Sequence, residues 1–96
     1  MENLNSIIAK LQQHKGELVE KYGLSQMAIF GSYACKQQKE NSDVDILVEF
    51  KQPIGLKFID LAEELEQILS LKVDLVSKKG MKEKYYKSIE SDLAYV

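Results

Sequence analysis

The sequence predicts an α/β or α+β domain, in which helices cover a small β-sheet. Two long segments have helical spacing of apolar residues, short apolar or alternating runs lie between them, and the two kinds of segment follow each other along the chain. The 96 residues suffice for one hydrophobic core, so residues 1–96 are expected to form a single domain. With 45% hydrophobic and 29% charged residues, the composition is that of a globular protein rather than a disordered one.

Three helices are predicted from apolar residues at three- and four-residue spacing. The first covers residues 4–22 and ends at Gly23, whereas the second covers residues 58–69. The third follows Gly80 over residues 81–93, where apolar side chains recur every four positions and form a narrow seam.

Three strands are predicted between these helices. Residues 24–30 end in a continuous apolar run, and residues 71–77 alternate between apolar and polar side chains. Residues 43–50 alternate strictly, so that one face of the strand is core and the other begins with two carboxylates. A short helix over residues 32–36 completes the expected order of helix, strand, short helix, strand, helix, strand, helix.

Charge and cysteine content restrict the partners and the compartment. The net charge is −2, so the chain has no overall positive field that would hold a long nucleic acid duplex. No apolar run approaches the length of a membrane span, and the N-terminus lacks the pattern of a signal peptide. With Cys35 as its one cysteine, the chain is expected in the cytoplasm, without a membrane partner.

Paired aspartates carry the predicted chemistry. Asp43 and Asp45 are two residues apart on a strand, so their side chains leave the same face and repel each other. A divalent cation relieves that repulsion, and Asp74 offers a third carboxylate from another strand. Three aspartates can hold two metal ions for phosphoryl transfer, and their oxygen ligands favour Mg²⁺ or Mn²⁺ over zinc.

Gly31 and Ser32 form a candidate nucleotide-binding site. They follow a strand and are expected to open the short helix, where free backbone N–H groups attract anions. Glycine allows a phosphate to approach the backbone, and the serine hydroxyl can donate to a phosphate oxygen. Gly-Ser is also a common loop dipeptide, and Asp-x-Asp is often a solvated turn, so the prediction depends on the combination.

The combination resembles a known family. Residues 29–34, Ile-Phe-Gly-Ser-Tyr-Ala, and residues 41–50, Asn-Ser-Asp-Val-Asp-Ile-Leu-Val-Glu-Phe, contain Gly-Ser, ten residues and Asp-x-Asp. This is similar to the signature of DNA polymerase β-like nucleotidyltransferases, and in particular of the minimal nucleotidyltransferase (MNT) domains. The resemblance extends through residues 73–76 to the closing residues 94–96.

The resemblance implies a small mixed sheet flanked by helices and a Mg²⁺-dependent enzyme. Asp43 and Asp45 would bind both metals, Asp74 would complete the catalytic one, and Gly31 and Ser32 would hold the triphosphate of ATP. MNT domains often neutralise a HEPN-domain toxin by transferring AMP from ATP to a tyrosine hydroxyl. That antitoxin activity is the expected function, with Asp74 helping to deprotonate the acceptor.

One departure keeps a second function open. The family usually continues Gly-Ser-x-Ala-Arg-Gly, but this chain has Cys35 and Lys36 in place of Arg-Gly, so a bidentate phosphate contact is missing. The alternative is therefore a weak or inactive antitoxin that blocks its HEPN partner by binding alone. An antibiotic-modifying nucleotidyltransferase is disfavoured, because such enzymes carry an additional domain. In a chain this small, a partner or a second copy is expected to complete the acceptor site.

Overall fold

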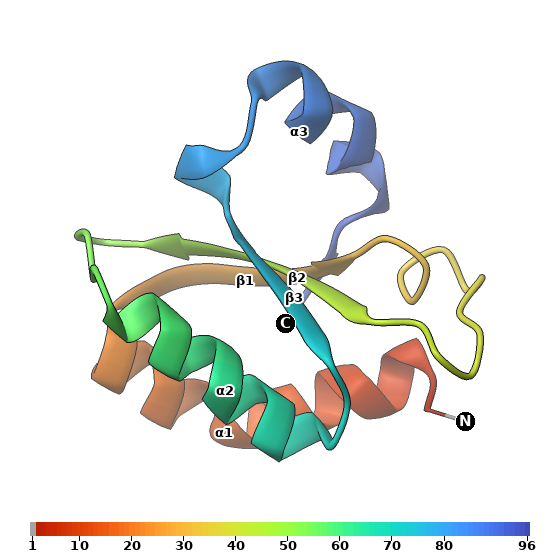
Figure 1. Cartoon of the computed structure of the whole chain (residues 1–96), viewed down its shortest axis with the longest axis horizontal. Coiled ribbons are helices and arrows are strands. Elements are labelled where there is room, and N and C mark those ends of the chain that lie inside the picture. Colours follow the sequence, from red (N-terminus) through yellow and green to blue (C-terminus); the bar gives the residue numbers. More distant parts are fainter. Residues whose placement is uncertain (1) are drawn as a thin grey trace.

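Helices on both faces of a four-stranded mixed sheet form the structure (Figure 1), a computed structural model that describes residues 2–96. The strand order is β3-β2-β1-β4, with β1 antiparallel to β2 and β4, and β2 parallel to β3. The elements are α1 (Leu4–Tyr22), β1 (Leu24–Phe30), β2 (Val44–Phe50), α2 (Lys57–Leu69), β3 (Val73–Ser77), the 3₁₀ turn η1 (Lys78–Gly80), α3 (Glu83–Ile89), the 3₁₀ turn η2 (Glu90–Asp92) and β4 (Ala94–Tyr95). The predicted fold class is confirmed.

Helix α1 has a defined cap at each end. The Asn3 side chain accepts a hydrogen bond from the Ser6 N–H, while the Ser6 hydroxyl accepts one from the Asn3 N–H, so two N–H groups at the helix start are satisfied. Gly23 ends the helix in the left-handed conformation, with φ 67°, and donates to the carbonyl of Val19. The chain then enters β1 directly.

The main core lies between the sheet and the two long helices. Helices α1 and α2 both lie below the sheet in Figure 1, and their apolar stripes face it. Helix α2 also makes the crossover that allows β3 to run parallel to β2. The fully buried side chains of this core include Ile7, Leu11, Leu18, Ile29, Val44, Ile46, Val48, Leu61, Leu65 and Leu69.

The opposite face of the sheet has a thinner cover. The C-terminal segment 78–93 lies above it in Figure 1, and none of the residues of α3 is buried. Lys78 ties this segment to the sheet, since its Nζ lies 3.5 Å from Oε1 of Glu49 and 4.7 Å from the centre of the Tyr86 ring. Ala28, Phe30 and Leu47 are the buried side chains on this face.

Two predicted helices are corrected by the structure. The helix expected over residues 81–93 is α-helical only at Glu83–Ile89, after which η2 leads into β4, a strand that the four-residue spacing did not reveal. The two residues of β4 pair with Ala28 and Ile29, because the free edge of β1 offers backbone partners there. The short helix expected over residues 32–36 is a series of turns, closed by a bond of 3.1 Å from Cys35 N to the Gly31 carbonyl.

The strands follow their predictions closely. Strand β1 has the predicted bounds, β2 begins one residue later than expected, and β3 begins at Val73 rather than Leu71. The delay in β3 follows from Ser70, which ends α2 in the left-handed conformation and turns the chain before it can pair. None of the helices within residues 2–96 is long and apolar enough to cross a membrane.

Candidate active site

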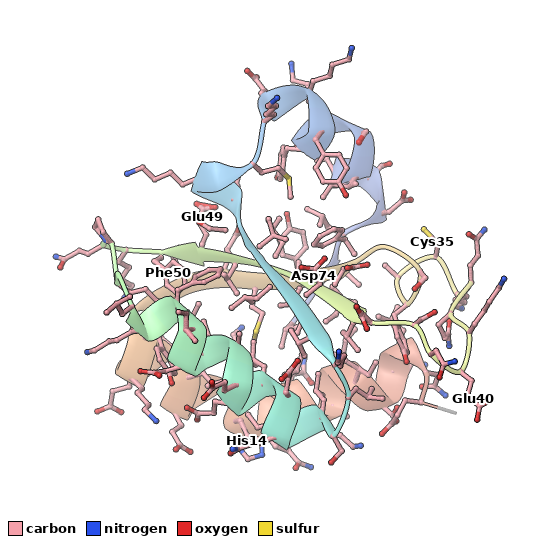
Figure 2. All side chains as sticks on the ribbon, viewed as in Figure 1. His14, Cys35, Glu40, Glu49, Phe50 and Asp74 are labelled. Carbon is pink, nitrogen blue, oxygen red and sulfur yellow. The ribbon has the colours of Figure 1, made fainter. Side chains whose placement is uncertain are left out.

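Asp45 and Asp74 lie side by side on the sheet. They are partners in the parallel register of β2 and β3, and on its other side Asp45 faces Phe30, the last residue of β1. Their neighbours Val44 and Val73 pack into the main core, so alternation turns both carboxylates to the opposite face, where Asp74 is labelled in Figure 2. Asp43 is exposed and immediately precedes β2, two residues from Asp45. The structure therefore brings Asp45 and Asp74 side by side, with Asp43 near enough for its charge to act on Asp45.

Gly31 brings the following loop directly against Asp45. Its φ is 74°, and a Cβ atom built on it would lie 2.0 Å from Oδ2 of Asp45. Any side chain here would overlap the carboxylate and also require a left-handed backbone. Glycine is thus needed both for the turn and for the close approach, which makes the carboxylate and the Gly31-Ser32 loop one site.

The loop after Gly31 presents unused donors. Cys35 N donates to the Gly31 carbonyl, and Gln37 N donates to the Ser32 carbonyl at 2.8 Å. Within the described chain, the N–H groups of Ser32, Tyr33 and Ala34 donate to no backbone carbonyl. One turn of helix-like backbone therefore provides the free N–H groups that a complete helix was expected to provide.

Tyr33 anchors this loop, a role that the sequence reasoning did not assign. The Tyr33 side chain is 1% exposed and belongs to the main hydrophobic core, whereas its neighbours in the chain, Ser32 and Ala34, are only half-buried. Burial of a ring of this size fixes the backbone on both sides of it. The available signal was an aromatic residue within a turn that is otherwise made of small and polar residues.

The surroundings of Asp45 disfavour its ionised form. Partial burial, followed by the negative charges of Asp74 and Asp43, raises the pKa of the Asp45 carboxyl from its ordinary 3.8 to about 6. Each of these causes disfavours the ionised carboxylate, and a cation bound between the aspartates would reverse the effect.

The three aspartates suit a divalent cation by the chemistry of their donor atoms. They provide oxygen ligands only, carry negative charge that the described residues do not neutralise, and lie beside free N–H donors. Among residues 2–96, no group of three or more histidine, cysteine, aspartate or glutamate side chains is arranged to hold a metal ion. A cation here would therefore take its remaining ligands from phosphate oxygens and water, as Mg²⁺ usually does.

The aspartates lie apart from two large hollows of the molecule. The two large hollows of the described chain, of about 830 and 850 Å³, lie elsewhere: one between α1 and α2, the other beside the loop between β2 and α2. None of the three aspartates lines either hollow.

Cys35 and Lys36 mark the outer edge of the site. Both are exposed, and Cys35 is labelled on the loop in Figure 2. Lys36 has φ 59°, a left-handed conformation that favours glycine, the residue that the family resemblance leads us to expect at this position.

Comparisons with known proteins agree on one family. The family model described as "Nucleotidyltransferase domain" matches residues 11–96. The protein named Protein adenylyltransferase MntA, from Thermococcus cleftensis, is 45% identical over 97 residues, which are 100% of this chain and 98% of that relative.

Solved structures show the same fold. A structure described as a minimal nucleotidyltransferase has a TM-score of 0.80 and 26% identity, covering 99% of this chain and 95% of its own. A chain from a complex of tri-AMPylated Shewanella oneidensis HEPN toxin with MNT antitoxin has a TM-score of 0.68 and 20% identity, covering 93% of this chain and 70% of its own.

Proposed function

The chain belongs to the nucleotidyltransferase domain family, among its minimal members, and from that premise we propose that it transfers AMP from ATP to a tyrosine hydroxyl of a HEPN-domain toxin. The observation that carries the proposal is the close packing of Gly31 against Asp45, which joins a loop with free N–H groups to a set of carboxylates. The activity in the name of the Thermococcus cleftensis relative, which this chain matches over its full length, also supports it.

Asp43, Asp45 and Asp74 are the proposed metal ligands, holding two Mg²⁺ ions, with Mn²⁺ as a substitute. When bound, the ions would neutralise the charge that develops on the transferring phosphate and on the leaving pyrophosphate. The raised pKa of Asp45 supports this assignment, because a carboxylate held against two others gains most from a nearby cation.

The loop at Gly31 and Ser32 is proposed to bind and orient the triphosphate. Its free N–H groups and the Ser32 hydroxyl can donate to phosphate oxygens, and Gly31 leaves room for their approach to the carboxylates. The acceptor oxygen then attacks the α-phosphorus of ATP, the bond from that phosphorus to the bridging oxygen breaks, and pyrophosphate leaves. Asp74 is proposed to accept the proton of the acceptor hydroxyl, and its exposure on β3 supports this role.

A HEPN-domain toxin is the proposed acceptor protein. The solved complex named above contains an AMPylated Shewanella oneidensis HEPN toxin and an MNT antitoxin, and a chain of that complex has the fold of this protein. The exposure of Asp43 and Asp74 supports an acceptor on another protein, since a partner surface could cover these two carboxylates.

The test is transfer of radiolabelled AMP from ATP to a HEPN-domain partner in the presence of Mg²⁺. The double variant Asp43→Asn/Asp45→Asn should lower the rate by about 1,000-fold or more, because the amides remove the charge that binds metal. Asp60→Asn is the matched control: this aspartate lies on α2, away from the three carboxylates, and its variant should retain full activity. Equal rates in all three proteins would exclude the proposed chemistry.

A second candidate function is neutralisation of the toxin by binding alone, which Cys35 favours because it stands where the family usually has a phosphate-binding arginine. The same double variant separates the two functions in a growth assay with the toxin. An enzyme loses protection with Asp43→Asn/Asp45→Asn, whereas a pure binding protein retains it.

A further inference from the structure

A second hollow lies at the other end of β2 from the aspartates. It has a volume of about 850 Å³ and lies between the loop after β2 and the 3₁₀ turn η1. Phe50 and Phe58 form part of its wall, with ring centres 6.2 Å apart and planes at 70°, and Pro53 and Ile54 extend this apolar wall. Phe50 and Glu49, which both line it, are labelled in Figure 2. We refer to this hollow as the β2–α2 groove.

Exposed apolar side chains adjoin the groove. Leu56 is 84% exposed and Ile59 57% exposed, and both neighbour lining residues in the chain. They are two of the four large hydrophobic residues that are exposed among residues 2–96. Exposed apolar side chains next in sequence to an apolar groove favour a protein-binding surface, because large exposed hydrophobic residues often mark such surfaces.

The charges around the groove are mainly positive. Lys51, Lys78 and Lys79 line it, and Glu49 is its one acidic residue. Glu49 already pairs with Lys78 at 3.5 Å, whereas Lys51 and Lys79 have no carboxylate partner in the described part of the chain. The surface thus combines an apolar wall with two available cations.

We propose that the β2–α2 groove docks a segment of another protein that is apolar on one side and carries carboxylates on the other. The apolar side would cover Phe50, Phe58 and Leu56, and the carboxylates would pair with Lys51 and Lys79. Phe50 is five residues from Asp45 on the same strand, roughly 17 Å at the usual rise. Docking is therefore separate from the carboxylate site and does not depend on the proposed transfer reaction.

The test uses three synthetic peptides of equal length with the purified, ¹⁵N-labelled chain. One is an amphipathic peptide of leucine and glutamate, the second replaces each glutamate with lysine, and the third replaces each leucine with serine. Only the leucine–glutamate peptide should shift the amide signals of residues 49–59 and 77–80. Equal binding of the lysine peptide, shifts confined to other residues, or no binding of any peptide would overturn the proposal.

Variants at exposed positions show which side chains bind. Leu56→Ser/Ile59→Ser should weaken binding of the leucine–glutamate peptide at least tenfold, while Tyr85→Ser, at a residue 52% exposed on α3, should leave it unchanged. Lys51→Glu/Lys79→Glu should reverse the preference, so that the lysine peptide binds better. An unchanged preference would contradict the charge assignment. A dimer of the chain that Leu56→Ser/Ile59→Ser dissolves in sedimentation experiments would replace the proposed partner with a second copy.

Discussion

The two faces of the sheet differ in what covers them. On one face, α1 and α2 bury a continuous layer of leucine, isoleucine and valine side chains. On the other, a short C-terminal segment leaves room for Asp45 and Asp74, and α3 has no buried residue. The difference shows how a small domain tolerates repelling carboxylates: one face supplies most of the stability, and the other can carry chemistry at some cost to it.

Leu65→Ala should destabilise the core on the helix-covered face of the sheet, and it should have the largest effect on the free energy of unfolding. Leu65 is 0% exposed in the main core, so its truncation removes buried apolar surface and leaves a cavity. The free energy of unfolding should fall by about 2–5 kcal/mol in urea denaturation. Ile59→Ala, on the exposed side of the same helix, should change it by less than about 0.5 kcal/mol. Similar losses of stability in both variants would show that α2 does not bury the side that carries Leu65.

Cys35→Arg should increase the activity of the site on the opposite face of the sheet. An arginine at this exposed position can form a bidentate contact with a phosphate, which the thiol cannot. We expect kcat/KM for ATP to rise by about tenfold, equivalent to about 1.4 kcal/mol. Cys35→Gln, which lacks the charge, should leave it unchanged in the same assay. An equal rise in both variants would mean that side-chain length rather than charge limits the site.

Asp45→Asn should reveal the cost of the carboxylates in metal-free buffer. The Asp45 pKa is about 6 in the folded chain and near 3.8 when unfolded, so its ionisation destabilises the fold progressively as the pH rises from 4 to 6, and fully above 6. Allowing for screening by water, the variant should be more stable by about 1 kcal/mol at pH 7.5. Thermal unfolding should show this gain at pH 7.5 and its disappearance at pH 3.5. A gain that is equal at both pH values would rule out ionisation as its cause.

Lys36→Gly should have the smallest effect. Lys36 holds φ 59°, and a left-handed conformation costs an ordinary residue about 1–2 kcal/mol, part of which glycine loses again through its freedom in the unfolded chain. A net gain of about 0.5 kcal/mol is expected in chemical denaturation. Gln37→Gly, next to it but without a positive φ, should instead lower the stability. If both variants lost stability, strain at Lys36 would be excluded.

Local pattern was sufficient for much of the fold. Apolar periodicity and glycine signals located α1, β1, β2 and α2 within about a residue, because each has one side facing the same core. The same alternation predicted that Asp43 and Asp45 share a face, since a two-residue step on a strand leaves no other choice.

The rest depended on contacts distant in sequence. No local pattern could place Asp74 beside Asp45, because that neighbourhood follows from the parallel register of β2 and β3, which the crossover through α2 establishes. Likewise β4 has only two residues and exists because the edge of β1 offers it hydrogen-bond partners. The helix expected over residues 81–93 was wrong in its second half for this reason.

By itself, the sequence determined the class of fold, the turn at Gly31-Ser32 and the family resemblance, all of which depend on residues close together in the chain. Only the tertiary structure decided that Gly31 lies against Asp45, that Asp74 raises the Asp45 pKa, and that Lys36 takes a left-handed conformation. These properties depend on distances between elements, and such distances follow from how the core packs rather than from the order of residues along any one element.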